Sequence, residues 1–376
     1  MTNTNIIHIT HTNPYKDSRI LNITESVSII DNRFNQFIIG INKEKRFKHK
    51  KKRIKIISLD LKSKSFPIFF KTFRKLFLIF EFNAKVLIKC ISIRPKIIHC
   101  HDLAGLYIGI IAKLFLKSKF IFDAHELEAQ QSFVTPFEHI LRSIYEFLPI
   151  LLCDHLITVS PSIALWYKWK GAKKISIIFN KPVCEINKTK INELSFLEKS
   201  PPPNDLINII YIGVLEKNRS IEKLLNLFES DKKFNLYFLG EGLLENTIKE
   251  KMKKNINIFL HPFVHKDKVT SFIKGFDYSL CLIEPSSLSS YFSMPNKLFQ
   301  SLASGVPVIV FNNPDISNYV RENNYGIVIE NINDIKNSLI KNNKNINYFR
   351  ENLIKNKNTF TWEDEFKKMK NIYQNL

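Results

Sequence analysis

The stretch "SYFSMPNKLFQSLASGVPVIV", residues 290–310, predicts a short helix followed by a buried strand. Pro295 suits the first turn of that helix, apolar side chains follow at helical spacing, and Gly305 suits its C-terminal cap. Residues 308–311 then have the uncharged, β-branched composition of a core strand in a parallel sheet. Lys297 adds a cation beside the free N–H groups and the positive dipole end of the helix, and together these favour a bound anion.

The composition indicates a globular chain with an anionic partner. Its 376 residues suggest two domains, and a hydrophobic content of 44% suffices for full cores. The formal net charge of +21 favours nucleic acid, acidic lipid or a phosphorylated substrate as the partner. Five cysteines without a C-x-x-C motif indicate a reduced, cytosolic chain. We expect neither a signal peptide nor a membrane-spanning helix, because no sufficiently long uncharged apolar stretch occurs.

Short β-branched runs alternate with helical stretches along the chain. This pattern predicts strands at residues 6–10, 36–41, 54–59, 96–101, 119–123, 156–160, 175–179, 207–213, 234–240, 256–261, 278–284, 308–311 and 326–330. The alternation predicts an α/β fold of two doubly wound, Rossmann-like domains that face a cleft. The expected parts are an N-terminal domain over 1–180, a linker over 181–206, a C-terminal domain over 207–355, and a final helix over 356–376 that returns to the N-terminal domain.

Residues 66–93 form a candidate amphipathic helix. Its polar stripe consists of Lys71, Arg74, Lys75, Glu81, Lys85 and Lys89. One interpretation is a helix packed on the first sheet, and the other is a helix that also lies in a membrane interface along its wide apolar arc. The basic run at 43–53 likewise predicts either a solvated loop or a patch for lipid headgroups.

Polar side chains end two successive predicted strands of the first half. They are His99, His101 and Asp102 in "KIIHCHDL", and Asp123, His125 and Glu126 in "FIFDAHEL". Period-two alternation places His99 and His101 on the same side of the sheet. Imidazoles and carboxylates at one sheet edge indicate recognition of sugar hydroxyls or acid–base catalysis. Zinc binding by His99, His101 and His125 is a rival, although the spacing matches no common zinc motif. For His99 and Asp123 we favour a structural role in helix capping or in the core.

Glycine turns follow the strands of the second half. Gly213 permits a tight turn, and Arg219 comes at the head of the next helix. "FLGEG" places Gly240 and Glu241 at the following strand end, where either a close ligand or a plain tight turn explains the glycines. Arg219 paired with Lys297 is a candidate diphosphate site, whereas Arg219 alone is equally consistent with a solvated first-turn residue.

These motifs resemble those of the GT-B-fold glycosyltransferases of family 4. The resemblance covers nearly the whole chain and rests on "NPYKDSRI", "IIHCHDL", "FDAHE", "IGVLEKNRS", "FLGEG" and "PNKLFQSLASGVPVI", in that order. It implies a nucleotide-sugar donor, with a uridine diphosphate sugar as the first choice, bound by the C-terminal domain. It also implies an acceptor bound by the N-terminal domain, retention of the anomeric configuration, and no metal or other cofactor.

The resemblance implies roles for individual residues. The expected catalytic residues are His101, Lys297 and Arg219. The expected donor-binding residues are Gly213, Arg219, Gly240, Glu241, Pro295, Asn296, Lys297, Leu298 and Gln300. The expected acceptor-binding residues are Arg19, Asp102, His125 and Glu126. On this interpretation the anion at the helix head is the donor diphosphate, whose negative charge grows as the glycosidic bond breaks.

The chain departs from the family pattern in three places. Where the family commonly has two glutamates eight positions apart, this chain has Phe292 and Gln300. Val214 replaces a basic residue after the glycine turn, and the N-terminal loop has no Gly-Gly pair. Gln300 can still hydrogen-bond ribose, whereas Phe292 cannot replace a carboxylate, for which Glu284 and Ser290 are candidate substitutes.

Three hypotheses follow. The first is a glycosyltransferase that moves a hexose or N-acetylhexosamine onto a lipid-linked surface polysaccharide, such as O-antigen or capsule, at the inner face of the cell membrane. The second is a nucleotide-sugar epimerase or hydrolase on the same fold. The third is a degenerate, non-catalytic nucleotide-sugar-binding protein. We expect no nucleic-acid partner, because the sequence contains no binding module and no patch of interleaved basic and aromatic residues.

Overall fold

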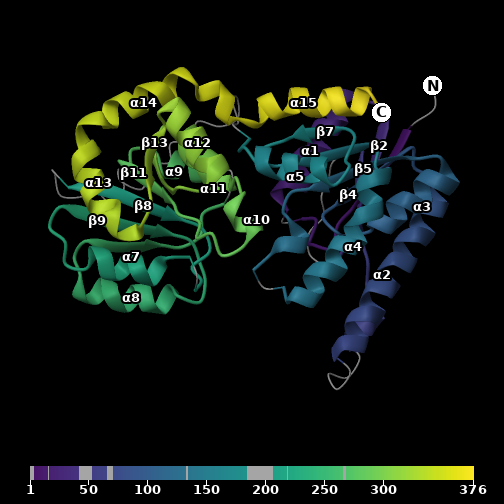
Figure 1. The fold of residues 1–376 in the computed structure, drawn as a ribbon, viewed down its shortest axis with the longest axis horizontal. Helices are drawn as coiled ribbons and strands as arrows, with labels where there is room; N and C mark the ends of the chain where they lie inside the picture. The colour runs from purple at the N-terminus through teal and green to yellow at the C-terminus, as the bar shows by residue number, and fades with distance from the viewer. Residues whose placement is uncertain are drawn as a thin grey trace. The chain divides into compact units, whose positions relative to one another are not determined.

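The computed structural model describes residues 4–15, 17–41, 53–65, 71–132, 134–183, 206–217, 219–265 and 268–376. The chain divides into two compact units (Figure 1). Unit 1 comprises Met1–Phe179 and Glu365–Leu376, and unit 2 comprises Asn180–Asp364. Most of the basic run at 43–53 and of the proline-rich stretch at 181–206 lies outside the described residues.

Unit 1 is built on a seven-stranded parallel sheet with the order β3-β2-β1-β4-β5-β6-β7. Its strands are β1 (Thr4–Ile9), β2 (Phe34–Gly40), β3 (Ile54–Ser58), β4 (Ile97–His101), β5 (Lys119–Ala124), β6 (His155–Thr158) and β7 (Ile175–Ile177). Its helices are α1 (Ser18–Ile30), α2 (Lys71–Ile93), α3 (Leu106–Leu116), α4 (Pro136–Leu152) and α5 (Pro161–Trp169). The central strands β1, β4 and β5 are almost entirely buried, as expected for a sheet covered by helices on both faces.

Unit 2 contains a six-stranded parallel sheet with the order β10-β9-β8-β11-β12-β13. Its strands are β8 (Ile207–Ile212), β9 (Phe234–Leu239), β10 (Ile258–His261), β11 (Tyr278–Cys281), β12 (Val308–Phe311) and β13 (Gly326–Ile329). Its helices are α7 (Ile221–Phe228), α8 (Glu245–Lys254), α9 (Val269–Phe272), α10 (Leu288–Tyr291), α11 (Asn296–Ala303), α12 (Pro314–Asn323), α13 (Ile335–Asn342) and α14 (Ile346–Lys355). Two parallel sheets flanked by helices confirm the predicted α/β class with two Rossmann-like domains.

Each predicted strand is present among the described residues, with ends that differ from the prediction by at most three residues. The segment 290–310 forms α11 and β12, and Gly305 follows the helix with a φ of +74°. The predicted position of Pro295 within the helix was wrong. Pro295 is the N-cap, one position before the first turn in which the sequence placed it, and its extended backbone (ψ of 155°) directs the chain into the helix.

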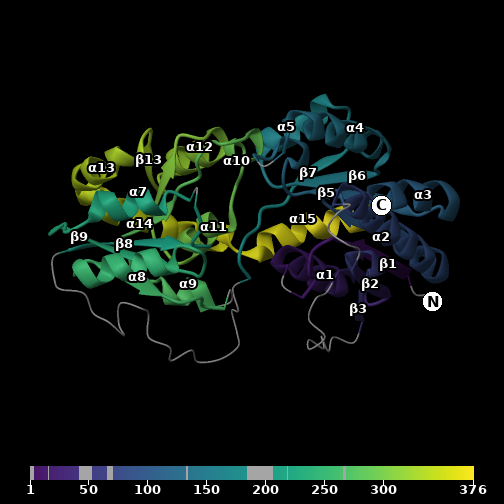
Figure 2. The ribbon, with the colours of Figure 1, turned by 90° about the horizontal axis from the view of Figure 1, so that it is seen from below.

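The last helix, α15 (Trp362–Gln374), begins in unit 2 and belongs to unit 1 from Glu365 onward (Figure 2). The Tyr373 hydroxyl reaches the core of unit 1, where it lies 2.7 Å from His99 Nδ1. The Phe179 N–H donates to Glu365 Oε2 (3.1 Å), and Lys368 Nζ donates to the Ile177 carbonyl oxygen (3.4 Å). The end of the chain therefore completes the core around β4 and β7.

The helix predicted at 66–93 begins at Lys71. It packs against α3, as expected for a helix that covers the first sheet, and some of its apolar side chains are nevertheless exposed. Within the described ranges, none of the helices is both long and apolar enough to cross a membrane.

Candidate functional site

Glycines bring two loops together at the carboxyl ends of β8 and β9. Gly240 has a φ of +154°, and a Cβ there would lie 1.9 Å from the Gly213 carbonyl oxygen. A Cβ at Gly242 would lie 2.4 Å from the Leu215 carbonyl oxygen. The Leu215 N–H donates to the Glu241 carbonyl oxygen (2.9 Å), and the Glu241 side chain is exposed. Packing between the two loops therefore requires these glycines, whether or not a ligand binds there.

Lys297 occupies the second position of α11, beside the carboxyl end of β11. Its Nζ donates to the Leu282 carbonyl oxygen (3.3 Å) and lies 4.9 Å from the centroid of the Tyr211 ring. Burial lowers the pKa of Lys297, and the positive charge of Arg219 lowers it further. The sequence analysis did not identify Tyr211, although it lies only two residues before Gly213.

The turn that carries Arg219 is fixed by a carboxylate. Arg219 is exposed, and Ser220 after it has a φ of +60°. Glu284 accepts hydrogen bonds from the Ser220 hydroxyl (2.8 Å) and from Lys223 Nζ (2.7 Å). Arg219 and Lys297 are thus two cations close enough for one to lower the pKa of the other, and an anion bound between them would relieve their repulsion.

The remaining predicted donor residues of α11 differ in exposure. Asn296 is exposed and Gln300 is half-buried, whereas the Leu298 side chain is fully buried in the core. The Leu298 N–H donates to the Pro295 carbonyl oxygen (3.1 Å), so it is already used within the turn. The N–H groups of the first two helical residues have no partner within the helix, and Lys297 is one of these residues.

The candidate substitutes for the missing carboxylate are both engaged. Glu284 holds the turn before α7, as described above. Ser290 forms a capping box with Ser287 at the start of α10. Phe292 ends that helix, and its ring stacks at a tilt with Tyr291, with 5.4 Å between centroids. The structure therefore offers no replacement for the glutamate at position 292 among the residues that the sequence suggested.

In unit 1, Asp123 is the centre of a buried network. Arg19 donates to both of its oxygens, at 2.9 and 2.7 Å, and also to the Ile178 carbonyl oxygen (2.9 Å). Burial by itself would raise the pKa of Asp123, but the charge of Arg19 and hydrogen bonds from neighbouring side chains hold it well below the usual value. Arg19 is only 4% exposed. The Arg19 guanidinium therefore binds groups within the core. The sequence analysis had instead predicted that Arg19 contacts the acceptor.

His101, the predicted catalytic histidine, is fully buried within this network. Its Nδ1 lies 3.2 Å from Asp123 Oδ2, and its Nε2 lies 3.3 Å from His8 Nδ1. His99 and His101 do lie on the same side of the sheet, as predicted, with ring centroids 4.3 Å apart. Burial lowers the pKa of His99 to about 3 and the pKa of His8 well below its usual value, so both rings are neutral.

The histidines suit a stacked core better than a metal site. The structure groups His8 with His99 and His101, with one nitrogen of each within 4.8 Å of the others, whereas the sequence suggested His125 as the third ligand. A metal ion lies in the ring plane of each imidazole that binds it. The rings of His99 and His101 are nearly parallel, at 12°, and those of His8 and His101 at 22°. Stacked rings cannot all point at one ion without rearrangement.

Asp102 and His125 form a pair at the carboxyl ends of β4 and β5. His125 Nε2 lies 2.9 Å from Asp102 Oδ2. Although burial lowers the pKa of His125, the carboxylate of Asp102 raises it to about 9, so the imidazole is charged at neutral pH. Asp102 is 5% exposed, and its other oxygen, Oδ1, has no hydrogen-bond partner in the described part of the chain. This oxygen is itself buried, so its capacity to accept a hydrogen bond is unused among the described residues.

The sequence analysis did not identify two further glutamates of unit 1 whose pKa values are raised. Burial, with the charges of Asp102 and Glu126, raises the pKa of Glu128 to about 7. Burial also raises the pKa of Glu146 on α4 to about 7, despite Lys170 Nζ at 3.7 Å. Glu128 lies two residues after Glu126 in the "HELE" motif. Because it follows the same predicted strand end as His125 and Glu126, the sequence could have identified it as a candidate. Nothing in the sequence marks Glu146, because its burial depends on how α4 packs.

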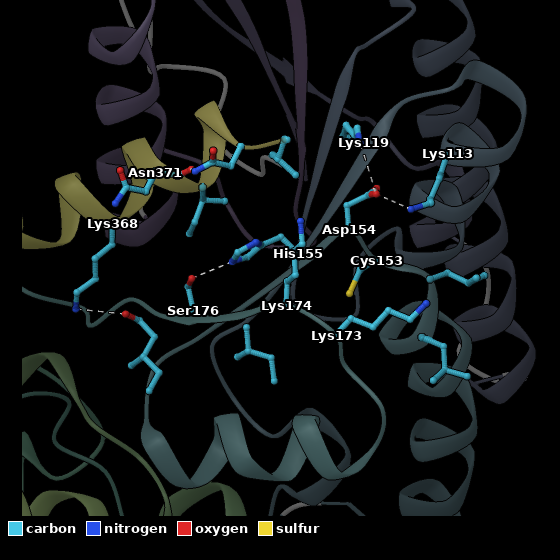
Figure 3. A pocket seen from close by; sticks show the side chains of 17 residues that line it. Lys113, Lys119, Cys153, Asp154, His155, Lys173, Lys174, Ser176, Lys368 and Asn371 are labelled. Carbon is cyan, nitrogen blue, oxygen red and sulfur yellow. Dashed lines mark hydrogen bonds and ion pairs between the residues drawn. The ribbon is translucent and has the colours of Figure 1, made fainter.

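A cavity lies at the opposite edge of the sheet of unit 1 (Figure 3). It has a volume of about 840 Å³ and is formed at the amino ends of β5, β6 and β7 with part of α15. Its basic lining residues are Lys113, Lys119, His155, Lys173, Lys174 and Lys368. Lys113 and Lys119 converge on Asp154, at 2.7 and 3.9 Å. None of the predicted site residues lines this cavity, so it is not the predicted substrate site.

Two families of known proteins match the sequence. Residues 194–372 match the model of "Glycosyl transferases group 1", and residues 47–180 match that of "Glycosyltransferase Family 4". The chain is a GT-B glycosyltransferase. The donor residues predicted around α11 fall within the group 1 match, and the acceptor residues predicted after β4 and β5 fall within the family 4 match.

Solved structures share the fold of this glycosyltransferase. Sucrose-phosphate synthase from Thermosynechococcus elongatus superimposes with a TM-score of 0.79 at 13% identity, over 99% of this chain and 98% of that one. Anabaena HepE in complex with UDP-glucose gives a TM-score of 0.70 at 12% identity, over 99% of this chain and 100% of that one. The lipopolysaccharide outer core galactosyltransferase WaaB gives a TM-score of 0.63 at 16% identity, over 99% of this chain and 100% of that one. No curated protein sequence matches the glycosyltransferase.

Proposed function

We propose that the enzyme is a retaining glycosyltransferase of family 4. It moves a hexose or N-acetylhexosamine from a nucleotide-diphosphate sugar to a lipid-linked acceptor of a surface polysaccharide, such as O-antigen or capsule. We take uridine diphosphate as the leaving group, because HepE has been solved with UDP and with UDP-glucose. The acceptor class follows the likeness to WaaB, which acts on the lipopolysaccharide outer core. The enzyme acts at the inner face of the cell membrane and needs no metal.

The cation pair of Lys297 and Arg219 is the observation that carries the donor assignment. Both side chains stand at helix starts beside the carboxyl edge of the unit 2 sheet, where ligands bind in doubly wound folds. During transfer the bond between the sugar C1 and the phosphate oxygen breaks, and a bond from C1 to the acceptor oxygen forms. Negative charge grows on the departing diphosphate, and two fixed cations stabilise that charge more than they stabilise the ground state.

Asp102 and His125 are the groups that we assign to the acceptor. Asp102 Oδ1 has no hydrogen-bond partner among the described residues and, once the acceptor gains access to this buried oxygen, can accept the hydrogen bond of the attacking hydroxyl. The hydroxyl proton then passes to the released diphosphate. The charged His125 lies 2.9 Å from Asp102 Oδ2 and orients the Asp102 carboxylate. His101 and Arg19 act through Asp123 and position the ends of β4 and β5, which is a structural role in place of direct contact with the sugar.

The donor assignment is tested by nucleotide binding. Among uridine, guanosine, cytidine and adenosine diphosphates, we expect uridine diphosphate to raise the melting temperature of the enzyme most. Lys297→Met should weaken this binding about 10- to 100-fold, because a charge-assisted contact to phosphate is lost. Lys249→Met on α8 is the control, since Lys249 is 55% exposed and forms an ion pair with Glu245 in the next turn back. Equal binding by both variants would refute the assigned site.

Transfer itself is tested with uridine diphosphate sugars and a lipid-linked oligosaccharide extract. Retention predicts a product whose new glycosidic bond has the anomeric configuration of the donor, which NMR coupling constants of the product reveal. An inverted product would contradict the retaining mechanism. Release of free sugar or an epimerised nucleotide sugar, without any transfer, would favour the hydrolase or epimerase instead.

A further inference from the structure

We propose that the cavity of Figure 3 binds a soluble organic phosphate with several negative charges, such as a nucleoside triphosphate, and that the bound ligand holds α15 against the sheet of unit 1. The cavity lies at the amino ends of β5, β6 and β7, away from the candidate acceptor residues. The inference goes beyond the proposed function, because it concerns regulation of the enzyme and does not depend on the transfer reaction.

The lining of the cavity is strongly basic. It includes five lysines, namely Lys113, Lys119, Lys173, Lys174 and Lys368. Asp154 is the one acidic side chain in the lining, and both of its oxygens are engaged. Its Oδ1 lies 2.7 Å from Lys113 Nζ, and its Oδ2 accepts a hydrogen bond from the Phe120 N–H (2.9 Å). Lys173 and Lys174 are exposed and have no ion-pair partner among the described residues. Cations gathered in a concave site attract an anion.

His155 lies within the same lining, next to one of these lysines. Its Nε2 lies 2.9 Å from the Ser176 Oγ. Burial lowers the pKa of His155, and the positive charge of Lys174 lowers it further. A phosphate bound at Lys174 would offset that charge and raise the pKa of His155. The His155 imidazole is therefore a reporter for an anion in the cavity.

The size of the cavity and its apolar wall indicate a ligand larger than inorganic phosphate. The volume of about 840 Å³ falls in the range of small-molecule sites, about 300 to 1,000 Å³. Apolar side chains line it together with the lysines, and they are Leu151, Leu152, Ile175, Ile177 and Ile372. Each lysine binds a phosphate oxygen as a point charge, so several lysines suit the several charges of an oligophosphate. The apolar wall suits an organic group attached to it.

Strand β5 separates the cavity from the candidate acceptor residues. Lys119 begins this strand at the cavity, and Ala124 ends it next to His125. Five steps along a strand, at about 3.3 Å each, make about 16 Å. A small ligand in the cavity therefore does not contact His125 or Asp102. This distance argues for an effector and against the sugar acceptor as the occupant.

Helix α15 supplies one side of the cavity, so a ligand there would join this helix to the sheet. The residues that α15 contributes are Lys368, Asn371, Ile372 and Asn375 (Figure 3). The neighbouring Tyr373 hydroxyl lies 2.7 Å from His99 Nδ1 in the core. A phosphate group held both by Lys368 and by Lys173 or Lys174, before β7, makes contacts that exist only while α15 is docked. Such a ligand stabilises the docked helix by mass action.

Isothermal titration calorimetry of the whole enzyme saturated with uridine diphosphate tests the site, because the donor site is then occupied. We expect tripolyphosphate to bind, and adenosine triphosphate to bind more tightly because its organic group meets the apolar wall. The double variant Lys173→Met/Lys174→Met should weaken both about tenfold or more, since two charge-assisted contacts are lost. The double variant Lys341→Met/Lys344→Met is the matched control, since it removes the same charge from exposed lysines of unit 2.

Two further measurements with tripolyphosphate place the ligand in the cavity. NMR titration should show that the ligand raises the pKa of the His155 imidazole. Hydrogen exchange should show slower exchange of the α15 backbone amides with the ligand in the wild type, and a much smaller change in Lys173→Met/Lys174→Met. Neither measurement requires sugar transfer.

Several outcomes would overturn the proposal. They are the absence of binding by either phosphate ligand, equal losses from the two double variants, and a His155 pKa that the ligand leaves unchanged. The proposal also fails if Lys173→Met/Lys174→Met reduces binding to phosphatidylglycerol vesicles but not to tripolyphosphate, because the lysines would then serve a lipid headgroup. Equal melting temperatures of the variants without ligand establish that their folds are intact. Tripolyphosphate binding by an enzyme that does not bind uridine diphosphate would support the cavity site and refute the donor assignment, so the two failures are distinguishable.

Discussion

Replacing Glu146 with glutamine should stabilise unit 1 at alkaline pH and leave it nearly unchanged at acid pH. Glu146 lies fully buried on α4, and burial raises its pKa to about 7, although Lys170 Nζ lies 3.7 Å away. The folded chain thus holds this proton more tightly than the unfolded chain, whose glutamates titrate near 4.3. The contribution of Glu146 to stability therefore falls as the pH rises from about 4.5 through about 7. Glutamine keeps the shape of the protonated form at every pH.

The size of the effect follows from the two pKa values. With a folded pKa of about 7, ionisation of Glu146 removes about 2.5 kcal/mol of stability between pH 5 and pH 8.5. If the folded pKa is one unit lower, the loss is about 1 kcal/mol. For a unit of this size, each kcal/mol shifts the melting temperature by about 2 to 4 °C. We therefore expect Glu146→Gln to melt several degrees above the wild type at pH 8.5.

Differential scanning calorimetry at several pH values between 5 and 8.5 measures this difference. The pH dependence of every other group is shared by both proteins and cancels when the two are compared at each pH. Glu351→Gln on α14 is the control, because Glu351 is exposed and its replacement tests the loss of one charge alone. A difference between Glu146→Gln and the wild type that stays constant with pH would refute the reasoning. A difference that turns negative at high pH would show that the contact with Lys170 outweighs burial.

Two further predictions concern the site loops. Gly240→Ala should lower the unfolding free energy of unit 2 by several kcal/mol, because its Cβ would lie 1.9 Å from the Gly213 carbonyl oxygen. Gly305→Ala, where a Cβ meets nothing within 4 Å at a φ of +74°, should cost only about 1 kcal/mol, and equal urea midpoints would contradict this account. Asp102→Asn should lower the pKa of His125 from about 9 toward or below 6.5, since burial then acts without the carboxylate. NMR titration of the histidine ring protons measures this shift, and an unchanged pKa would assign the charge to another group.

The fold could be predicted from the sequence because each strand is a short β-branched run with a turn signal after it. The segments 308–311 and 207–213 lie within a residue of the observed β12 and β8. Strand ends near glycine were also placed well, because only glycine adopts the backbone that the turns need, as at Gly240. Pro295 was misplaced by one position, since proline fits both the N-cap and the first turn and local chemistry does not separate the two.

Only single residues of the candidate site could be identified from local patterns. Lys297 and Arg219 were each identified from the residues around them, and the structure places them close enough for Arg219 to lower the pKa of Lys297, while their role in donor binding stays a prediction. Arg19 and Asp123 are 104 residues apart in the sequence, and no local pattern could show that the guanidinium donates hydrogen bonds to the carboxylate in the core. For the same reason His101 looked accessible in the sequence, although its two ring nitrogens face Asp123 and His8.

An exposed apolar stripe on α4 shows another limit of sequence reasoning; it consists of Phe137, Ile140, Leu141, Ile144, Phe147 and Leu148. A helix with this many apolar residues is normally assigned to the core, and the sequence analysis placed the membrane hypothesis on residues 66–93 and on the basic run at 43–53. Only the exposure of residues such as Phe137 and Ile144 reveals that the stripe has no partner within the described chain. Burial of a helix face depends on which element covers it, and that information is not local.

The return of α15 to unit 1 has a consequence for how the enzyme folds. The contact between His99 and Tyr373 spans 274 residues, and the whole of unit 2 lies within that span. During synthesis, unit 1 cannot complete its core until the last helix has left the ribosome, whereas unit 2 has all of its residues before then. If unit 2 folds first, it brings the ends of the intervening chain closer and reduces the entropy lost when α15 docks. On that route the core of unit 1 is completed last, although most of unit 1 is synthesised first, and a fragment ending at Phe179 would leave His99 without its hydroxyl partner.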